Sequence, residues 1–355
     1  MRTLNVHLCC LFIACLPTLA EARSRRSDVE LALRAVDELE AQGAYEAARR
    51  QLQGLVRHVS PARGEDLVMR RCELWHRQNE PAECRRCYLS LVGHGLTSVE
   101  HIAQARHRAA AAALELGETE AGRRELTLLV DDLPYTESAR RAFVLARALH
   151  RERTGYMGES EFLMQVASRL AWVAEPGANR EESVLARQLL AEALVEVGRL
   201  RLLEGKDAEA AQRILERARP IAHATVWEDD AIVWLARSLR ALGRRGEALG
   251  AYQELIDSQK TSWFMGVYTS EFYDDALYEV GQTLEEMRRY SEAERAYAEL
   301  FRRVPTSRLL DDAAFRIASL TAERRRDRSA LSAFIRDYPA SRHVRAARSA
   351  MTMMP

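Results

Sequence analysis

Lysine is nearly missing from this sequence, and so is any excess of charge. Lys206 and Lys260 are the only lysines, so arginine supplies 50 of the 52 basic residues. The 52 acidic residues balance them, which argues against nucleic-acid binding, where a basic excess is expected. The arginine bias fits codon usage in a GC-rich genome or, alternatively, arginine networks on the protein surface.

Catalytic signatures are also missing. The chain has no phosphate-binding Gly-x-x-x-x-Gly-Lys loop, no Gly-x-Gly-x-x-Gly, no Gly-x-Ser-x-Gly and no His-Glu-x-x-His. Its carboxylates alternate with arginines at spacings of three and four residues, a pattern typical of solvated ion pairs on helices. We therefore predict a protein that is not an enzyme and has no cofactor.

A bilayer-spanning apolar run is missing as well. The longest candidate, Leu8–Leu19, is too short to cross a membrane and follows the basic Arg2. With Ala20-Glu21-Ala22 behind it, residues 1–22 read as a signal peptide, cleaved to release an exported, periplasmic protein. The alternative is lipidation at Cys15, which would anchor the chain peripherally to the outer membrane.

Strand signals are scarce, whereas alanine, leucine, arginine and glutamate, all strong helix formers, dominate the 355 residues. Asp-Asp-Ala occurs three times, ending at Ala231, Ala276 and Ala313. Each of these alanines is followed 17 residues later by another alanine and 21 residues later by an aromatic residue, namely Tyr252, Tyr297 and Phe334. Fixed spacing over three copies predicts an all-α solenoid, which is a surface for binding other molecules.

The second copy shows the packing logic. Leu277, Gly281 and Leu284 lie on one helix face, and Ala293 and Tyr297 face back from the next helix. Gly281 and Ala293 are small, so we expect the two helices to approach closely, with Tyr297 filling the space beside them.

These residues, together with Pro305, resemble the signature of the tetratricopeptide repeat. Asp337-Tyr338-Pro339-Ala340-Ser341 resembles a turn of bacterial envelope repeat proteins of the Tol-Pal-associated cell-division coordinator and outer-membrane-protein assembly lipoprotein types. The resemblance implies a right-handed solenoid of helical hairpins. It is clearest over residues 229–342, within a C-terminal region of residues 179–355.

Weaker copies continue upstream, at Gly43–Ala48, at Ala110–Pro134 and at Gly198–Ile214. We assign residues 23–178 to degenerate N-terminal repeats, with longer connections at 153–160 and 175–180 and a hinge near 175–182. Seven to nine hairpins are expected, and residues from about Ser341 onward should form a capping helix.

Three cysteines remain after the signal peptide. In the register that the resemblance implies, Cys72 and Cys84 take the two small positions where helices touch, which favours a Cys72–Cys84 disulfide. Pairing of Cys72 with Cys87, three free core thiols, and a metal site made by Cys72, His76, Cys84 and Cys87 are the alternatives. The last of these would make the chain a metal-binding protein or an enzyme.

An aromatic insertion separates the first two Asp-Asp-Ala copies, which are 45 residues apart, whereas the next two are 37 apart. Five of the 11 residues in 263–273 are aromatic, and aromatic side chains are favoured binding anchors. We predict that Trp263, Phe264, Tyr268, Phe272 and Tyr273 contact a partner. The alternative is that the insertion folds back and buries its rings.

The resemblance also implies a groove lined by the first helix of each hairpin. Its predicted partner-binding residues are Asp230, Arg237, Asp275, Tyr278, Gln282, Asp312 and Phe315, in a stripe that also includes Val233 and Ser319. Helix capping alone could explain the paired aspartates. The sequence thus predicts a scaffold or adaptor that binds protein or peptide partners in a cell-envelope complex, or alternatively a lipidated assembly or secretion accessory factor.

Overall fold

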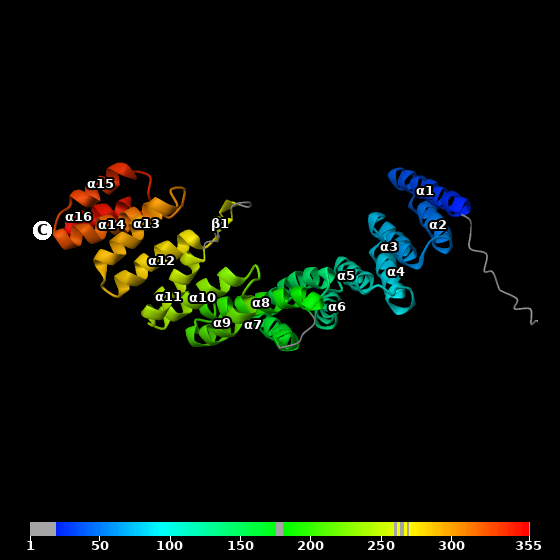
Figure 1. Cartoon of the computed structure of the whole chain (residues 1–355), viewed down its shortest axis with the longest axis horizontal. Helices are drawn as coiled ribbons and strands as arrows, with labels where there is room; N and C mark the ends of the chain where they lie inside the picture. The colour runs from blue at the N-terminus through cyan, green and yellow to red at the C-terminus, as the bar shows by residue number, and fades with distance from the viewer. Residues whose placement is uncertain (1–18, 175–179, 259–260, 263–265, 268–269, 355) are drawn as a thin grey trace, which may run out of the picture. The chain divides into compact units, whose positions relative to one another are not determined.

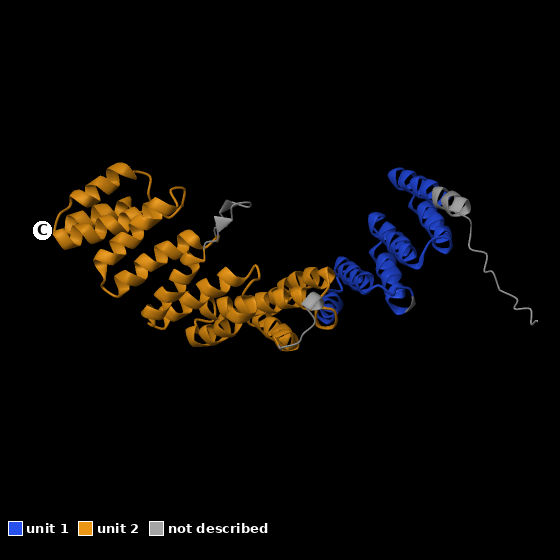
Figure 2. Ribbon diagram, viewed as in Figure 1, with its two compact units in different colours: residues 1–129 blue, residues 130–355 orange. Residues whose placement is uncertain are grey.

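The computed structural model describes residues 19–174, 180–258, 261–262, 266–267 and 270–354. This part of the chain is almost entirely helical (Figure 1), which confirms the all-α prediction. It divides into two compact units, residues 1–129 and 130–355 (Figure 2). Each unit is built of helical hairpins, and each hairpin packs on the next, as in an α-solenoid.

Unit 1 contains the weaker repeats predicted from the sequence. Its elements are α1 (Leu19–Ala41), α2 (Tyr45–Leu55), the 3-10 helix η1 (Val56–His58), α3 (Pro61–Arg77), α4 (Pro81–His94), α5 (Val99–Glu115) and most of α6 (Thr119–Asp132). The turn predicted at Gly43–Ala48 is present, because α1 ends at Ala41 and α2 begins at Tyr45. The core of this unit includes Leu52 and Leu74, which are fully buried.

Unit 2 contains the clear repeats and a capping helix. Its elements are α7 (Glu137–Arg169), the 3-10 helix η2 (Ala171–Ala174), α8 (Arg180–Leu203), α9 (Ala208–Ala222), α10 (Glu228–Ala241), α11 (Arg245–Asp257), α12 (Tyr273–Glu286), α13 (Tyr290–Arg303), α14 (Leu310–Arg325), α15 (Ser329–Asp337) and α16 (Val344–Met353). As predicted, a single helix, α16, follows the last hairpin, and its buried Ala347 shares a core cluster with residues of α14 and α15. The hinge predicted near 175–182 falls inside this unit, and residues 175–179 lie outside the described part.

One predicted connection is wrong. Instead of a long loop at 153–160, the backbone leaves the helical conformation only at Thr154 and Gly155, so α7 folds back on itself as a hairpin. The ring centroids of Phe143 and Phe162, from its two halves, are 5.8 Å apart. Gly155 takes φ of 66°, a left-handed value that lets the chain reverse without a longer loop. With this hairpin, the described residues form eight hairpins and α16, within the predicted range.

Every hairpin turn contains one residue in the left-handed region. Four are glycines, including Gly43 and Gly243, and the others are Asn79, Lys206, Arg288 and Arg326. A left-handed residue just after a helix is a common helix end because it lets backbone N–H groups reach the last free carbonyls. Here, for example, the amide of Arg244 donates to the carbonyl of Leu239. The same bond recurs where the sequence lacks glycine, since the amide of Arg289 donates to the carbonyl of Leu284 in the turn that contains Arg288. Gly155, with ψ of −157°, does not share this geometry.

The predicted core contacts are confirmed in the second Asp-Asp-Ala hairpin. Ala276, Ala293 and Tyr297 are all fully buried. A Cβ atom placed on Gly281 would lie 2.5 Å from the Tyr297 ring, which no real side chain tolerates. Gly281 is therefore required by the close approach of α12 and α13. Among the described residues, no helix is both long enough and apolar enough to cross a bilayer.

Candidate functional site

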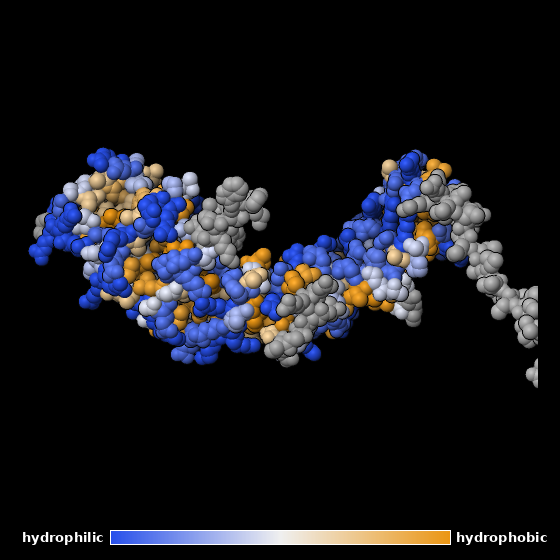
Figure 3. Space-filling model, in the orientation of Figure 1, coloured by the Kyte–Doolittle hydropathy of each residue, from blue (hydrophilic) through white to orange (hydrophobic). Residues whose placement is uncertain are grey.

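The predicted groove residues lie on the first helices of the hairpins in unit 2, and we call this surface the first-helix face. It comprises Asp230 and Arg237 on α10, Asp275, Tyr278 and Gln282 on α12, and Asp312 and Phe315 on α14. Polar residues cover most of the molecular surface visible in Figure 3, with apolar patches between them. Val233, predicted for the same stripe, is fully buried and belongs to the core.

Arg237 joins two consecutive hairpins. Its guanidinium donates to Glu279 (2.8 Å) and Asp275 (3.0 Å) on α12. The same group lies 4.6 Å from the Trp234 ring centroid and 5.9 Å from that of Phe272. Burial raises the pKa of Asp275, and the charge of Arg237 opposes that rise. Arg237 and Asp275 are thus brought together, and each restrains the other.

Tyr278 and Gln282 are held on the next turns of α12. The Tyr278 ring lies 5.3 Å from Tyr297, and burial raises the pKa of its hydroxyl. The Gln282 carbonyl accepts a 2.9 Å hydrogen bond from Arg240 on α10, and Arg240 also pairs with Glu286. These contacts fix the position of side chains that remain half-buried, so the surface exists before any partner arrives.

Asp312 is almost fully buried. It is only 4% exposed, accepts a 2.7 Å hydrogen bond from Arg342, and pairs with His343. The His343 ring stacks on Phe315 with centroids 4.6 Å apart. The segment that leads into α16 therefore already occupies the Asp312 carboxylate, and a contact of Asp312 with a partner stays a prediction.

An acidic pocket of about 690 Å³ lies at the N-terminal ends of α12 and α14, and we call it the acidic edge pocket. Its lining contains five carboxylates and two guanidiniums: Glu271, Phe272, Asp274, Asp275, Arg308, Leu309, Asp311, Asp312 and Arg342. The first aspartates of the second and third pairs are used structurally. Asp274 accepts from Ser307 and Asp311 accepts from Ser341, the hydroxyls of the segments that begin the following hairpins.

The paired aspartates therefore do more than cap their own helices. The residues at the N-cap positions of α10, α12 and α14 make no side-chain cap bond, and the aspartates follow in the first turn, where they favour the helix dipole. Asp274 additionally accepts a 3.0 Å bond from the amide of Asp275. The capping explanation was incomplete, because the contact to the next hairpin is not visible in one repeat alone.

Asp230 is the least compensated carboxylate of the first-helix face. Burial raises its pKa to about 7, and the negative charges of Glu271, Glu196 and Asp229 add to the shift. Glu192 on α8 behaves alike, since burial raises its pKa to about 7 against the opposing charge of Arg147. The face is therefore electronegative at this end, where the pKa of Asp230 and that of the nearby Glu192 on α8 are both raised towards neutral pH.

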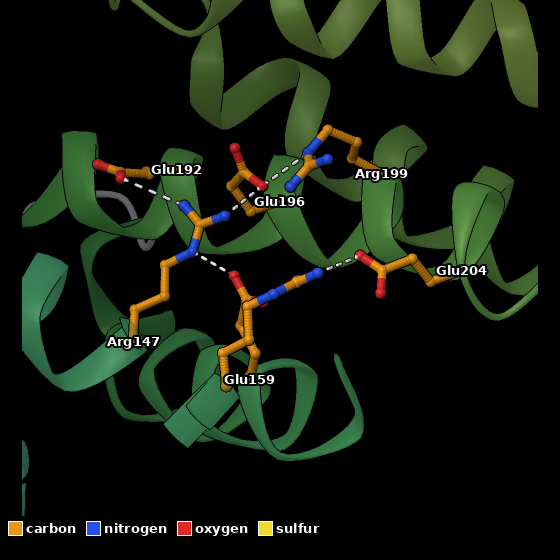
Figure 4. Close-up of polar contacts among 7 residues, drawn as sticks. Arg147, Glu159, Glu192, Glu196, Arg199 and Glu204 are labelled. Atoms are coloured by element: carbon orange, nitrogen blue, oxygen red, sulfur yellow. Dashed lines mark hydrogen bonds and ion pairs between the residues drawn. The ribbon is translucent and has the colours of Figure 1, made fainter. Parts of the chain in front are cut away.

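An ionic network next to Asp230 connects α7 with α8 (Figure 4). Arg147 pairs with Glu159 at 2.5 Å and Glu196 at 2.6 Å. Arg151 joins Glu159 to Glu204. Burial alone would raise the pKa of Glu159, yet the hydrogen bonds from Arg151 and Arg147 lower it. Each buried charge of the network has a partner of opposite charge. This arrangement indicates a structural role in holding α7 and α8 together rather than a reactive site.

The aromatic insertion is placed only in part. Trp263, Phe264 and Tyr268 lie outside the described residues. Tyr273 is 3% exposed, and its hydroxyl accepts a 3.0 Å bond from Arg303, so the prediction that it contacts a partner is wrong. Phe272 is half-buried and packs on the core. The end of the insertion thus folds back because its rings complete the core beside α10.

A pair of short β-strands, which begins just before the insertion, was not expected from the sequence. Strands β1 (Thr261–Ser262) and β2 (Gly266–Val267) pair antiparallel, Thr261 opposite Val267. Each strand has two residues, too few for an alternating pattern to be recognised.

The preferred cysteine pairing is also wrong. Cys72 on α3 is bonded to Cys87 on α4, with Cα atoms 5.5 Å apart, and Cys84 is a buried free thiol. Cys84 does occupy the core position that the register implied, but the side chain one helical turn later reaches Cys72. Burial raises the pKa of the Cys84 thiol to about 11. Because the disulfide consumes two of the four proposed metal ligands, the Cys72, His76, Cys84 and Cys87 metal site is excluded.

The described residues contain no cluster of three or more histidine, cysteine or acidic side chains placed to hold a metal ion. Sequence reasoning missed Trp234, Glu279 and Arg342, which position the predicted residues. The spacing of Trp234 and Arg237, three residues apart on one helix face, was the available signal for the first of them. What the face offers chemically is a restrained surface of aromatic rings, carboxylates and amides, suited to binding.

Two segments of the chain, residues 230–262 and 275–307, match the family model of the tetratricopeptide repeat. No curated protein sequence matches the chain. The C-terminal part of a tetratricopeptide repeat protein from Cytophaga hutchinsonii is similar in structure, with a TM-score of 0.44 and 12% identity over 79% of this chain and 98% of that one. The repeat assignment rests on the two matched segments and on the hairpins described above.

Two further solved structures are similar at the same level. One is the apo form of the quorum sensor NprR from B. thuringiensis, with a TM-score of 0.40 and 14% identity over 91% of this chain and 87% of that one. The other is a signal transduction ATPase with a tetratricopeptide repeat sensor from Pyrococcus horikoshii, with a TM-score of 0.46 and 12% identity over 95% of this chain and 55% of that one.

Proposed function

We propose that this protein is a non-enzymatic scaffold of the bacterial cell envelope that holds a segment of a partner protein on its first-helix face. The observation that carries the proposal is the restraint of that face between hairpins. Arg237 and Arg240 on α10 fix Asp275, Glu279 and Gln282 on α12. A surface whose side chains are already ordered loses little conformational entropy when a partner binds.

Export to the periplasm is part of the proposal. The sequence of residues 1–22 supports it, and these residues include the signal pattern ending at Ala22. The Cys72–Cys87 disulfide also supports it, since disulfides persist in oxidising compartments. Lipidation at Cys15 with outer-membrane attachment is the second form of the same proposal. Incorporation of a labelled acyl chain that depends on Cys15 would distinguish the two.

Site-specific photocrosslinking in cells tests the binding face. A photoreactive phenylalanine replaces Tyr278 on α12 or, as a matched control, Tyr290, which is 38% exposed at the start of α13. We expect a discrete crosslinked partner from position 278 and none from position 290. Equal products from both positions, or none from position 278 in an exported and folded protein, would contradict the proposal.

The aromatic insertion gives a second test of the same function. Deleting residues 263–267 should weaken partner crosslinking at position 278 if the insertion contributes to binding. The helical circular dichroism signal should not change, because the buried core residues of this region belong to the helices before and after the deleted segment. Loss of helicity would instead assign the insertion to the fold.

A further inference from the structure

A second pocket lies away from the first-helix face, where α7, η2, α8 and α9 meet. Its volume is about 430 Å³, within the range of small-molecule sites. Apart from two arginines, every residue that lines it is apolar. Its floor includes Val173 and Leu194, which are fully buried, and Leu190, which is 1% exposed. The site is thus an apolar cavity with charge confined to two side chains.

Those two side chains are Arg187 on α8 and Arg217 on α9, both exposed. In the part of the chain that the structure describes, neither forms a hydrogen bond or an ion pair. Other arginines of the same helices do: Arg199 pairs with Glu196, and Arg219 pairs with Glu254. The lining of the cavity thus carries two guanidiniums and no carboxylate.

Apolar surface extends beyond the cavity. Trp172 of η2, between the lining residues Ala171 and Val173, is 40% exposed, and Val184, one helical turn before Arg187, is 54% exposed. Exposed aromatic and aliphatic residues that adjoin a cavity usually mark a contact site.

From these features we infer that the pocket binds one long-chain fatty acid, with its chain in the cavity and its carboxylate paired with Arg187 and Arg217. A planar guanidinium matches a carboxylate through two parallel hydrogen bonds. The apolar lining suits a methylene chain, which leaves water when it binds. The volume accommodates a single chain rather than the two chains of a diacyl phospholipid. This inference goes beyond the proposed scaffold function and does not depend on it.

Binding of myristate to the purified full chain tests the inference. The ligand is titrated below its micellar concentration, and affinity is measured by calorimetry and by tryptophan fluorescence. We expect one saturable site. A fluorescence change that is largely lost in Trp172→Phe, with calorimetric affinity retained, would place the chain beside η2.

Charge and volume variants decide between specific and general hydrophobic binding. Arg187→Gln with Arg217→Gln should weaken myristate binding at least tenfold. Arg345→Gln with Arg348→Gln, which removes two exposed arginines of α16, should not. Ala174→Trp, which fills the cavity from an exposed position, should also weaken binding at least tenfold.

All of these variants are at exposed positions, so thermal unfolding should confirm that each remains folded. The inference is overturned if the wild type does not bind myristate. It is also overturned if a trimethylammonium amphiphile of equal chain length binds as tightly, or if the Arg187 and Arg217 double variant binds like the α16 control. None of these outcomes bears on crosslinking at position 278, so the scaffold proposal is tested separately.

Discussion

Ser307 donates a 2.7 Å hydrogen bond to the carboxylate of Asp274, across the junction between two hairpins. The Ser307 hydroxyl also accepts from the amide of Leu309, so it orders the segment that begins α14. The Ser341 hydroxyl repeats this arrangement, donating to Asp311 at 2.6 Å. The spacing of the second and third Asp-Asp-Ala copies is therefore explained partly by a contact that ties the α12–α13 hairpin to α14 and the α14–α15 hairpin to the segment before α16.

Removing either partner of the first contact should loosen the junction. Ser307→Ala and Asp274→Asn should each lower the free energy of unfolding, and a double-mutant cycle should give a coupling of about 1.5–3 kcal/mol, as for a hydrogen bond to a charged group. Urea denaturation of the four proteins measures it. The Ser341 and Asp311 pair should give a coupling of similar size, and additive effects in both cycles would contradict a direct contact.

A counterpart of this contact exists in unit 1 with different residues. The Glu65 carboxylate on α3 accepts from the amides of Thr97 and Ser98 and from the ring of His101, at the start of α5. Hydrogen bonds from Thr97 and His101 lower the pKa of Glu65 to about 2. No fixed sequence motif connects the two versions, so comparison of repeats in the sequence could not reveal it.

Much of the fold could be predicted because its determinants are local and periodic. A small residue and an aromatic residue recur at the repeat positions of Gly281 and Tyr297, and the contact of these two follows from residue size alone. The Cys72–Cys87 pairing could not be predicted. Cys84 and Cys87 lie one helical turn apart, and the repeat register does not tell which of the two thiols is close enough to bond to Cys72. The burial of Tyr273 was one of two alternatives that the sequence left open, since an aromatic residue in an insertion suits both a core and a surface.

Gly281→Ala tests the close approach of α12 and α13. In an exposed helix this change would stabilise by about 1 kcal/mol. Here the added methyl would lie 2.5 Å from the Tyr297 ring, so we expect a loss of about 1–3 kcal/mol from overpacking. Gly250→Ala on α11 is the matched control, because its Cβ would meet no atom within 4 Å and should stabilise the protein. Thermal or urea unfolding measures whether each change raises or lowers the free energy of unfolding. Stabilisation by both changes would contradict the close approach of α12 and α13 at Gly281.

The disulfide predicts unequal effects of the cysteines. Cys72→Ser opens a bond that joins residues 15 apart in sequence, for which loop-closure entropy implies a loss of about 3 kcal/mol. Cys84→Ser only buries a hydroxyl in place of a free thiol, so we expect a loss of about 1 kcal/mol.

Non-reducing peptide mapping should find Cys72 joined to Cys87 and a free thiol at Cys84. Reducing agent should lower the stability of the wild type towards that of Cys72→Ser and leave Cys72→Ser itself unchanged. A bond between Cys72 and Cys84 would restore the pairing that the sequence favoured.

The raised pKa of Asp230 makes stability depend on pH in a defined direction. Its folded value of about 7 exceeds the value of about 3.9 expected in the unfolded chain, so the folded state binds the proton more tightly. The stabilisation from protonated Asp230 is complete below about pH 4 and is lost as pH rises through about 7. At pH 8 the ionised carboxylate is therefore unfavourable in the folded protein.

Asp230→Asn should consequently raise the free energy of unfolding at pH 8 and have little effect at pH 4. Because the side chain remains partly open to water, we expect a gain of about 1 kcal/mol rather than the full value of the pKa shift. Glu159→Gln is the opposite control, since arginine partners lower the pKa of Glu159 and its neutralisation should destabilise the protein at pH 8. Urea unfolding at both pH values measures the two variants. A pH-independent effect of Asp230→Asn would show that its carboxylate is ionised across the range, and the electronegative end of the first-helix face would then lack a group that titrates near neutral pH.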